Sequence, residues 1–288
     1  MPLDEDKYPT QTGRRRFVKG VVGSAAIAGI AAGGAATVNT ATSQTGAGGG
    51  TTSYIGIENT GGPAPRGMPI VPIEVTDDGE LRGKWPEVGE QDVAGQTITV
   101  AEEELGGVTY SSSWFQYCGV QQYAGTQPDA DADNLLRVKS GYEWMSDLST
   151  GQPLTVDDFS DYREWGNGIG RSGLGKPANA NWRTTQDGRP LPVEILRSPE
   201  VPKMINGERG FRDYSQLSQG VRDFLDAATE QNFIAWLDKC THFCCTPGFK
   251  TSTFGGAEDS VYCQCHQSIY DPFSPTELQF VALPRPEE

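Results

Sequence analysis

The sequence predicts a mainly β domain behind an N-terminal transmembrane helix. Three observations predict this class. Short runs rich in Val, Ile and Thr, bounded by Gly and Asp, recur along the chain; only one stretch has clear helical spacing; and an apolar run rich in Gly and Ala stands near the N-terminus. Beyond residue 53, the rest of the 288-residue chain suffices for one large domain or for a domain with a large insertion.

The first segment, residues 1–39, has the pattern of an export signal. Residues 13–19 read G-R-R-R-F-V-K, which fits the twin-arginine pattern R-R-x-F-L-K with valine for leucine. The apolar run over 21–38 is at the short end for a membrane span, and no Ala-x-Ala cleavage signal follows closely after Ala35. We therefore expect an uncleaved anchor in the cell membrane, with the head domain on the extracytoplasmic face. A cleaved signal is the alternative.

The next segment, residues 40–53, is composed almost entirely of Thr, Ser, Ala and Gly. Such a stretch has no apolar face and behaves as a flexible coil, with an r.m.s. span of roughly 20 Å for about 14 residues. We interpret it as a linker that would let a head domain move. A spacer without mechanical role is the alternative.

Residues 54–149 form an N-terminal part or insertion of unknown role. They contain short strand candidates at 69–75 and 97–100, bounded by Gly and Asp. The aromatic residues between 101 and 150 match no pattern that we can assign.

Residues 150–288 carry the clearest structural signals. Two strand candidates, 180–184 and 191–196, flank an Asp-Gly turn, which predicts a hairpin. Residues 233–237 (F-I-A-W-L) predict a buried strand that leads to Cys240. Residues 214–229 predict a helix, whose apolar face would hold Leu217, Val221, Phe224, Leu225 and Ala228.

The charge balance excludes one class of partner. A net charge of −15 and a pI near 4.6 make nucleic acid an unsuitable partner. An acidic surface on an exported protein is typical of a salt-adapted organism, and we expect a halophilic archaeon. A field that steers a basic electron acceptor is the competing interpretation, but the Debye length is about 3 Å at molar salt, so long-range steering would be nearly lost.

A candidate metal centre lies near the C-terminus. Cys240-x-His242 is followed by Cys263-x-x-His266, and these contain both histidines of the chain. Two sulfur and two nitrogen donors suit a tetrahedral zinc ion, but zinc modules usually separate paired ligands by two to four residues. The other interpretation is a [2Fe–2S] cluster with two cysteines on one iron and two histidines on the other.

At these residues the sequence resembles the Rieske iron–sulfur protein family, whose two boxes read C-T-H-x-G-C and C-P-C-H-G-S-x-Y. The chain reads C-T-H-F-C-C from Cys240 and C-Q-C-H-Q-S-I-Y from Cys263. It departs at Cys244 and Gln267, which replace glycines, and at Gln264, which replaces a proline. Because glycine allows positive φ, we expect slightly altered backbone paths in both loops. The resemblance implies a Rieske-type antiparallel β-sandwich with a cluster-binding subdomain, within residues 150–288 and with cluster loops at 240–245 and 263–270.

The resemblance also implies the roles of four further residues. Cys245 and Cys265 would form a disulfide that ties the two loops together, a pair that soluble Rieske ferredoxins and Rieske oxygenases generally lack. Ser268 and Tyr270 would donate hydrogen bonds to the cluster sulfurs and raise the potential towards the upper part of the range of about −150 to +300 mV. Cys118 and Cys244 either pair in a second disulfide or remain free thiols.

The function implied is that of the quinol-oxidising branch of the family. The chain would carry one [2Fe–2S] cluster and act as the electron-transfer subunit of a cytochrome bc-type complex. The catalytic residues would be His242 and His266, one of which accepts a hydrogen bond from the quinol. The partners would be quinol, a cytochrome b-type membrane subunit, and a cytochrome c or blue-copper acceptor. Reduction would make the imidazoles more basic, so the potential should fall as the pH rises above the pKa of the oxidised state.

Two alternatives stay open. One is the Rieske subunit of another exported oxidoreductase, such as arsenite oxidase or a nitrate-reducing complex. The other, from a different class, is a structural zinc protein. A Rieske oxygenase is excluded because its mononuclear iron needs two further histidines. Residues 62–65 spell the G-P-A-P motif of the family's proline loop, but that loop follows the second box in the family, so we expect no such role here. The expected cover is made by Asp271, Pro272, Pro275 and residues 283–286.

Overall fold

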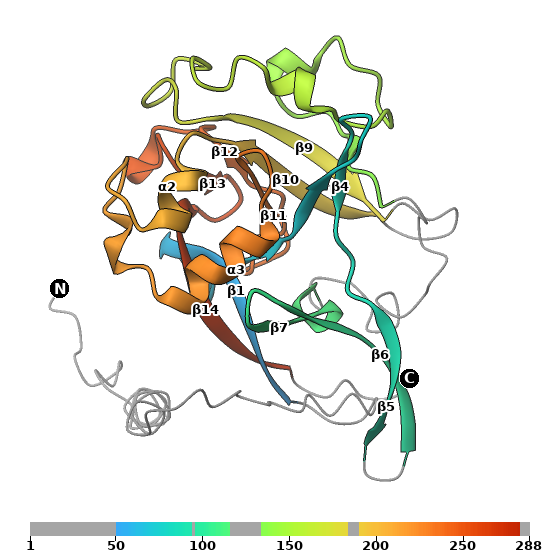
Figure 1. Cartoon of the computed structure of the whole chain (residues 1–288). Coiled ribbons are helices and arrows are strands. Elements are labelled where there is room, and N and C mark those ends of the chain that lie inside the picture. Colours follow the sequence, from blue (N-terminus) through green and yellow to red (C-terminus); the bar gives the residue numbers. More distant parts are fainter. Residues whose placement is uncertain (1–49, 94–95, 116–133, 184–189, 283–288) are drawn as a thin grey trace, which may run out of the picture. The chain divides into compact units, whose positions relative to one another are not determined.

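The computed structural model describes residues 50–93, 96–115, 134–183 and 190–282 (Figure 1). Within these ranges the protein is mainly β, as predicted, and every strand pairing is antiparallel. Nine strands form one curled sheet in the order β12-β13-β14-β1-β2-β11-β10-β9-β8, and two small sheets, β3-β4 and β5-β6-β7, accompany it. The strands are β1 (Gly50–Gly61), β2 (Met68–Val71), β3 (Ile73–Val75), β4 (Leu81–Gly83), β5 (Val88–Val93), β6 (Gln96–Leu105), β7 (Val108–Ser111), β8 (Arg137–Val138), β9 (Lys176–Trp182), β10 (Leu191–Arg197), β11 (Phe233–Leu237), β12 (Gly248–Phe249), β13 (Val261–Cys263) and β14 (Ser268–Ala282).

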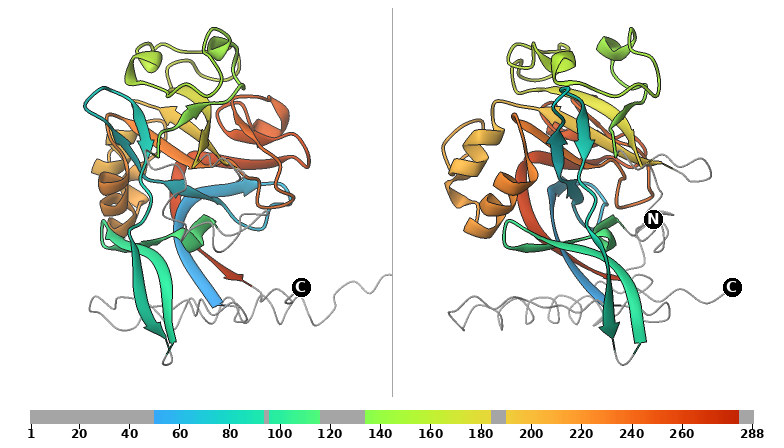
Figure 2. Two further views of the ribbon diagram at one scale, coloured as in Figure 1. Left: turned by 90° about the vertical axis from the view of Figure 1, so that its right-hand side faces the viewer. Right: turned by 45° about the vertical axis from the view of Figure 1, so that its right-hand side comes forward.

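The longest pairing in the sheet joins β1 to β14. It runs from Gly50 opposite Ala282 to Gly61 opposite Ile269, with one register shift where β14 passes from Pro275 to Asp271 and a second between Asn59 and Gly61 of β1. Proline has no N–H for the ladder, so prolines in strands are confined to edges and such irregularities. Both strands bend along their length in Figure 2. β2 then pairs with β1 on one side and with β11 on the other, which connects the two halves of the sheet.

Most of the predicted strands are confirmed. The run 69–75 divides into β2 and β3 at Pro72, and 97–100 lies inside β6. The predicted hairpin is formed by β9 and β10, with Trp182 opposite Leu191, although its Asp-Gly turn lies outside the described residues. β11 is fully buried and leads towards Cys240 as expected. Residues 134–175 cross over β9, where the Trp144 indole donates to the carbonyl of Pro177 (Figures 1 and 2).

The predicted helix begins later than expected. Residues 214–216 form a short 3₁₀ turn, and α3 occupies Gln219–Ala228 because the Ser218 side chain accepts a hydrogen bond from the N–H of Val221 and caps the helix. The predicted face, from Val221 to Ala228, is buried. A second helix, α2 (Val201–Asn206), lies beside α3 and ends at Gly207, which adopts the left-handed conformation (Figure 1).

The sheet includes strands from both sides of the expected boundary between residues 149 and 150. β1 and β2 precede that boundary and lie in the middle of the strand order. β1 also begins at Gly50, inside the segment predicted to be a linker. In the described part of the chain, no helix is long and apolar enough to span a membrane, and the predicted anchor lies outside it.

Candidate metal centre

The first loop follows β11. Its turn is closed by the N–H of Cys244, which donates to the carbonyl of Cys240 (2.9 Å), and by the N–H of Cys240, which donates to the carbonyl of Cys245 (2.7 Å). Cys244 has φ of 63°, the left-handed conformation that non-glycine residues rarely adopt.

The second loop connects β13 to β14 and repeats this geometry. The N–H of Gln267 donates to the carbonyl of Cys263 (2.8 Å), and Gln267 has φ of 64°. Each loop therefore has a cysteine at its first position and a left-handed residue four positions later. We expected altered backbone paths at Cys244 and Gln267, the two positions that are glycine in the resembled motifs. For φ this expectation is wrong, because both residues have the positive φ that glycine allows.

The two loops bring four metal-binding side chains together. Cys240 and Cys263 are buried and not in a disulfide, and the ring centroids of His242 and His266 lie 4.7 Å apart. Nδ1 of His242 is buried without a hydrogen-bond partner among the described residues, which suits a nitrogen that binds metal. The His266 side chain is exposed, so this end of the site is accessible to a partner.

Hydrogen-bond donors surround the sulfur atoms. Burial raises the pKa of the Cys240 thiol, but the hydroxyl of Tyr270, the N–H of His242, the Cys263 thiol and the hydroxyl of Ser268 together bring this pKa below its usual value. Burial and the neighbouring Cys240 raise the pKa of Cys263, although two backbone N–H groups of its own loop also point at its sulfur. Such donors favour thiolate, which is the form that binds metal.

The predicted disulfide between Cys245 and Cys265 is confirmed and joins the two loops. Its sulfurs lie within 4.8 Å of the sulfur of Cys263, but a disulfide offers no thiolate to a metal ion. Cys244 is disulfide-bonded as well. Cys118, with which we considered pairing it, lies outside the described residues.

The two predicted hydroxyls lie at the sulfur atoms. Tyr270 is fully buried, donates to Sγ of Cys240 (3.2 Å) and accepts from the N–H of Thr241 (3.1 Å). Burial and the hydrogen bond to Cys240 raise the pKa of Tyr270, so this phenol keeps its proton and remains a donor. Ser268 is fully buried and pairs with Cys263 across the β13–β14 ladder.

The G-P-A-P segment, which we expected to have no role here, contacts the second loop, and the next residue, Arg66, contacts the first. The N–H of Ala64 donates to Oγ of Ser268 (3.2 Å), and Oγ1 of Thr241 donates to the carbonyl of Arg66 (2.5 Å). Gly62 has φ of 81°, and a Cβ there would lie 2.4 Å from the carbonyl oxygen of Gln267. The segment therefore lies against the loops, where a covering element was expected from Asp271, Pro272, Pro275 and residues 283–286. The first three are buried within β14, and residues 283–286 lie outside the described residues.

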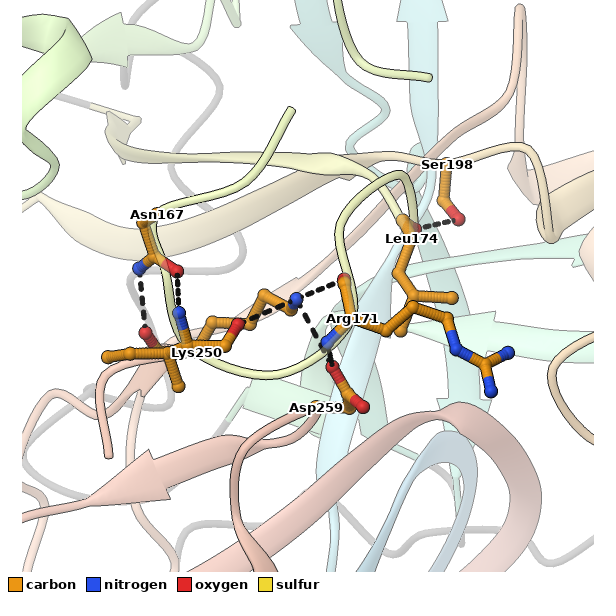
Figure 3. Close-up of polar contacts among 7 residues, drawn as sticks. Asn167, Arg171, Leu174, Ser198, Lys250 and Asp259 are labelled. Carbon is orange, nitrogen blue, oxygen red and sulfur yellow. Dashed lines mark hydrogen bonds and ion pairs between the residues drawn. The ribbon is translucent and has the colours of Figure 1, made fainter. Parts of the chain in front are cut away.

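A buried lysine supports the hairpin that carries Cys263. Lys250 follows β12, and its ammonium group donates to the carbonyls of Ile169 (2.9 Å) and Arg171 and pairs with Asp259 (3.1 Å) (Figure 3). In the same close-up, the side chain of Asn167 donates to the carbonyl of Lys250 (2.9 Å). These contacts hold residues 167–171 against the β12–β13 connection, and nothing in the sequence pattern had singled out Lys250.

One apolar side chain is exposed at the site. Phe243 is 65% exposed, and its ring centroid lies 4.2 Å from that of His242 and 5.0 Å from that of His266. It therefore covers part of both imidazoles and presents an aromatic face to any partner that approaches them.

Comparison of the chain with models of protein families, with characterised proteins and with solved structures finds no match. The functional argument therefore rests on the site itself. Two buried thiols and two imidazoles, divided equally between two loops, fit a [2Fe–2S] cluster with mixed ligands, and they also fit a zinc ion by donor type alone.

Proposed function

We propose that this chain is the Rieske [2Fe–2S] subunit of a membrane quinol-oxidising complex of the cytochrome bc type. One observation carries the proposal, namely the two equivalent loops that each provide one buried thiol and one imidazole and that are tied by a disulfide. Cys240 and Cys263 would bind one iron, and His242 and His266 the other. A disulfide at the surface also agrees with an extracytoplasmic location.

The finer fold belongs to this proposal. We assign the site to a Rieske-type cluster-binding subdomain, built from β12, β13, the first part of β14 and the G-P-A-P segment. The other strands of the curled sheet would form the base. The similar closure of the two loops supports this assignment, as does the burial of both thiols beneath accessible imidazoles.

The bound cluster would supply a one-electron acceptor. The outer nitrogen of one imidazole would accept a hydrogen bond from the quinol hydroxyl and would take the proton when the quinol is oxidised. The electron would leave for a cytochrome c or blue-copper protein, and a cytochrome b-type membrane subunit would hold the quinol. Phe243 would exclude water from the imidazoles when the head is docked.

The hydroxyl donors support a high potential. Donors aimed at sulfur stabilise the added negative charge of the reduced state, and a high potential is what quinol oxidation requires. Tyr270 and Ser268 occupy such positions here.

The first test is an EPR spectrum of the full chain, reduced with ascorbate and then with dithionite. A Rieske-type signal with ascorbate alone is expected, and it should be lost in Cys240→Ser and retained in Gln264→Ala, an exposed position in the second loop. A signal only after dithionite would refute quinol oxidation in favour of a low-potential carrier. Zinc without any iron would establish the structural zinc site instead.

Partner subunits decide which complex is involved. Co-purification from membranes should recover a cytochrome b-type protein. Recovery of a molybdenum-containing oxidoreductase instead would favour the alternative assignment to an arsenite- or nitrate-linked complex.

A further inference from the structure

A buried acidic site lies on β10 and at the end of β11, the strand that leads to the first loop. Glu194 of β10 stands opposite Trp236 of β11 and Asn179 of β9, in one row across three strands. Asp238 follows Trp236 by two residues and continues the ladder through its N–H, which donates to the carbonyl of Pro192 (2.9 Å). Residues two apart in extended chain share a face, so both carboxyl groups are directed to the same side.

The two carboxyl groups are incompletely satisfied. Glu194 and Asp238 are fully buried. Oε1 of Glu194 accepts from the hydroxyl of Tyr142 and from the N–H of Phe249 (2.8 Å). Among the described residues, Oε2 of Glu194 and both oxygens of Asp238 have no well-formed hydrogen bond, although the Trp236 indole N–H interacts with Glu194. Two buried carboxylates in this state cannot both be charged without a large desolvation cost.

The groups around Glu194 determine its protonation state. Burial raises its pKa to about 7, against the opposing effects of Tyr142, the Phe249 N–H, Trp236 and the half-buried Lys139. Burial and Glu194 itself raise the pKa of Asp238 well above its usual value. Burial and Glu194 also raise the pKa of Tyr142, which therefore remains a hydrogen-bond donor. Glu194 is thus the group of this set that changes its charge near neutral pH.

We propose that Glu194 is a redox-linked proton site, which takes a proton from solvent when the neighbouring metal centre gains an electron. The inference rests on the proposed function, because it needs a centre that a quinol can reduce. One electron enters the centre, one proton adds to a carboxylate oxygen of Glu194 to form an O–H bond, and the net charge of this region is unchanged. The site differs from the two imidazoles because Glu194 and Asp238 are fully buried in the sheet, whereas the His266 side chain is exposed.

The coupling follows from position. Glu194 lies opposite Trp236, four residues before Cys240 on the strand that leads to the first loop, and Asp238 lies between Trp236 and Cys240 along the chain. An added negative charge at the centre therefore destabilises the carboxylate of Glu194 and raises the pKa of this group, so more of it is protonated. In the pH range around the pKa of Glu194, the potential should fall as the pH rises, with a limiting slope of about 59 mV per pH unit for one proton per electron.

Redox-induced infrared difference spectroscopy of the full chain tests the proposal. Reduction at pH 7 should produce a carboxylic acid C=O band that is lost in Glu194→Gln and kept in Glu277→Gln, an exposed control on β14. The slope of potential against pH between about pH 6 and 8 should flatten in Glu194→Gln, whereas the alkaline slope due to the imidazoles should remain.

The outcomes separate the two proposals. A reducible cluster with no carboxyl band in the unsubstituted protein would overturn the proton site and leave the proposed function intact. A band that survives in Glu194→Gln would assign the proton elsewhere and also overturn it. If the full chain holds no reducible centre, both proposals fall together.

Discussion

Replacing Tyr270 by Phe removes one hydroxyl group that makes two well-defined contacts. The ring is fully buried and can remain in place, so the change affects the hydrogen bonds and little else. One bond runs to Sγ of Cys240 at 3.2 Å, and the other comes from the N–H of Thr241 at 3.1 Å. The first contact concerns the potential of the proposed cluster, and the second concerns the stability of the fold.

The magnitudes follow from these two contacts. A hydrogen bond to a charged acceptor contributes about 1.5–3 kcal/mol, and only the part that increases on reduction affects the potential. If that part is about 1 kcal/mol, the potential falls by about 40 mV, since about 59 mV corresponds to a tenfold change, or about 1.4 kcal/mol, for one electron. The N–H of Thr241 loses its acceptor, which should lower the unfolding free energy by about 1–3 kcal/mol.

The assay is a redox titration of Tyr270→Phe monitored by EPR, paired with denaturant unfolding. Tyr262→Phe is the matched control, because this tyrosine is also buried and lies on the neighbouring strand β13. An unchanged potential in Tyr270→Phe, with an intact cluster spectrum, would refute the claim that this hydroxyl tunes the centre.

Three further substitutions test other parts of the site. Ala64→Pro removes the N–H that fixes the hydroxyl of Ser268, so the potential should fall in a redox titration, while Ala64→Ser, which keeps the N–H, should leave it unchanged; equal potentials in both variants would contradict this reasoning. Replacing Cys245 and Cys265 together by Ser opens a loop with a sequence separation of 20, and denaturant unfolding should show a loss of about 3 kcal/mol, whereas no loss would mean that the loops are held by other contacts. Lys250→Met leaves a carboxylate and two carbonyls without their ammonium partner, and the unfolding free energy should fall by about 3 kcal/mol, an expectation that a change below about 1 kcal/mol would exclude.

Sequence reasoning located the candidate metal ligands because each pair stands within a short stretch of the chain. Cys240 and His242 are separated by one residue, and Cys263 and His266 by two, so the chain itself places each pair in one loop. The buried strand 233–237 was recognised as a continuous apolar run, and the buried face of α3 was recognised from apolar residues at helical spacing.

It failed where contact depends on the register of distant strands. The G-P-A-P segment carried a visible signal, but it precedes the cysteine loops, whereas the family's proline loop follows the second box, and this order argued against a role. The pairing of β1 with β14 brings it to Ser268 all the same. Glu194 offered a weaker signal, a single acidic residue within an apolar strand, and Lys250 offered none, since its partners are mainly backbone carbonyls.

The long β1–β14 pairing sets a condition on biosynthesis. The N–H that donates to Ser268 and the carbonyl that accepts from Thr241 are 204 and 175 residues away along the chain, and β1 gains its longer sheet partner only when β14 has been made. A nascent chain on the ribosome therefore cannot assemble the surroundings of the thiols, however early its first half folds. Bringing such distant segments together is also the slow part of folding. If the chain binds the proposed cluster, we expect insertion only after β14 has been synthesised, because the contacts around the thiols depend on it.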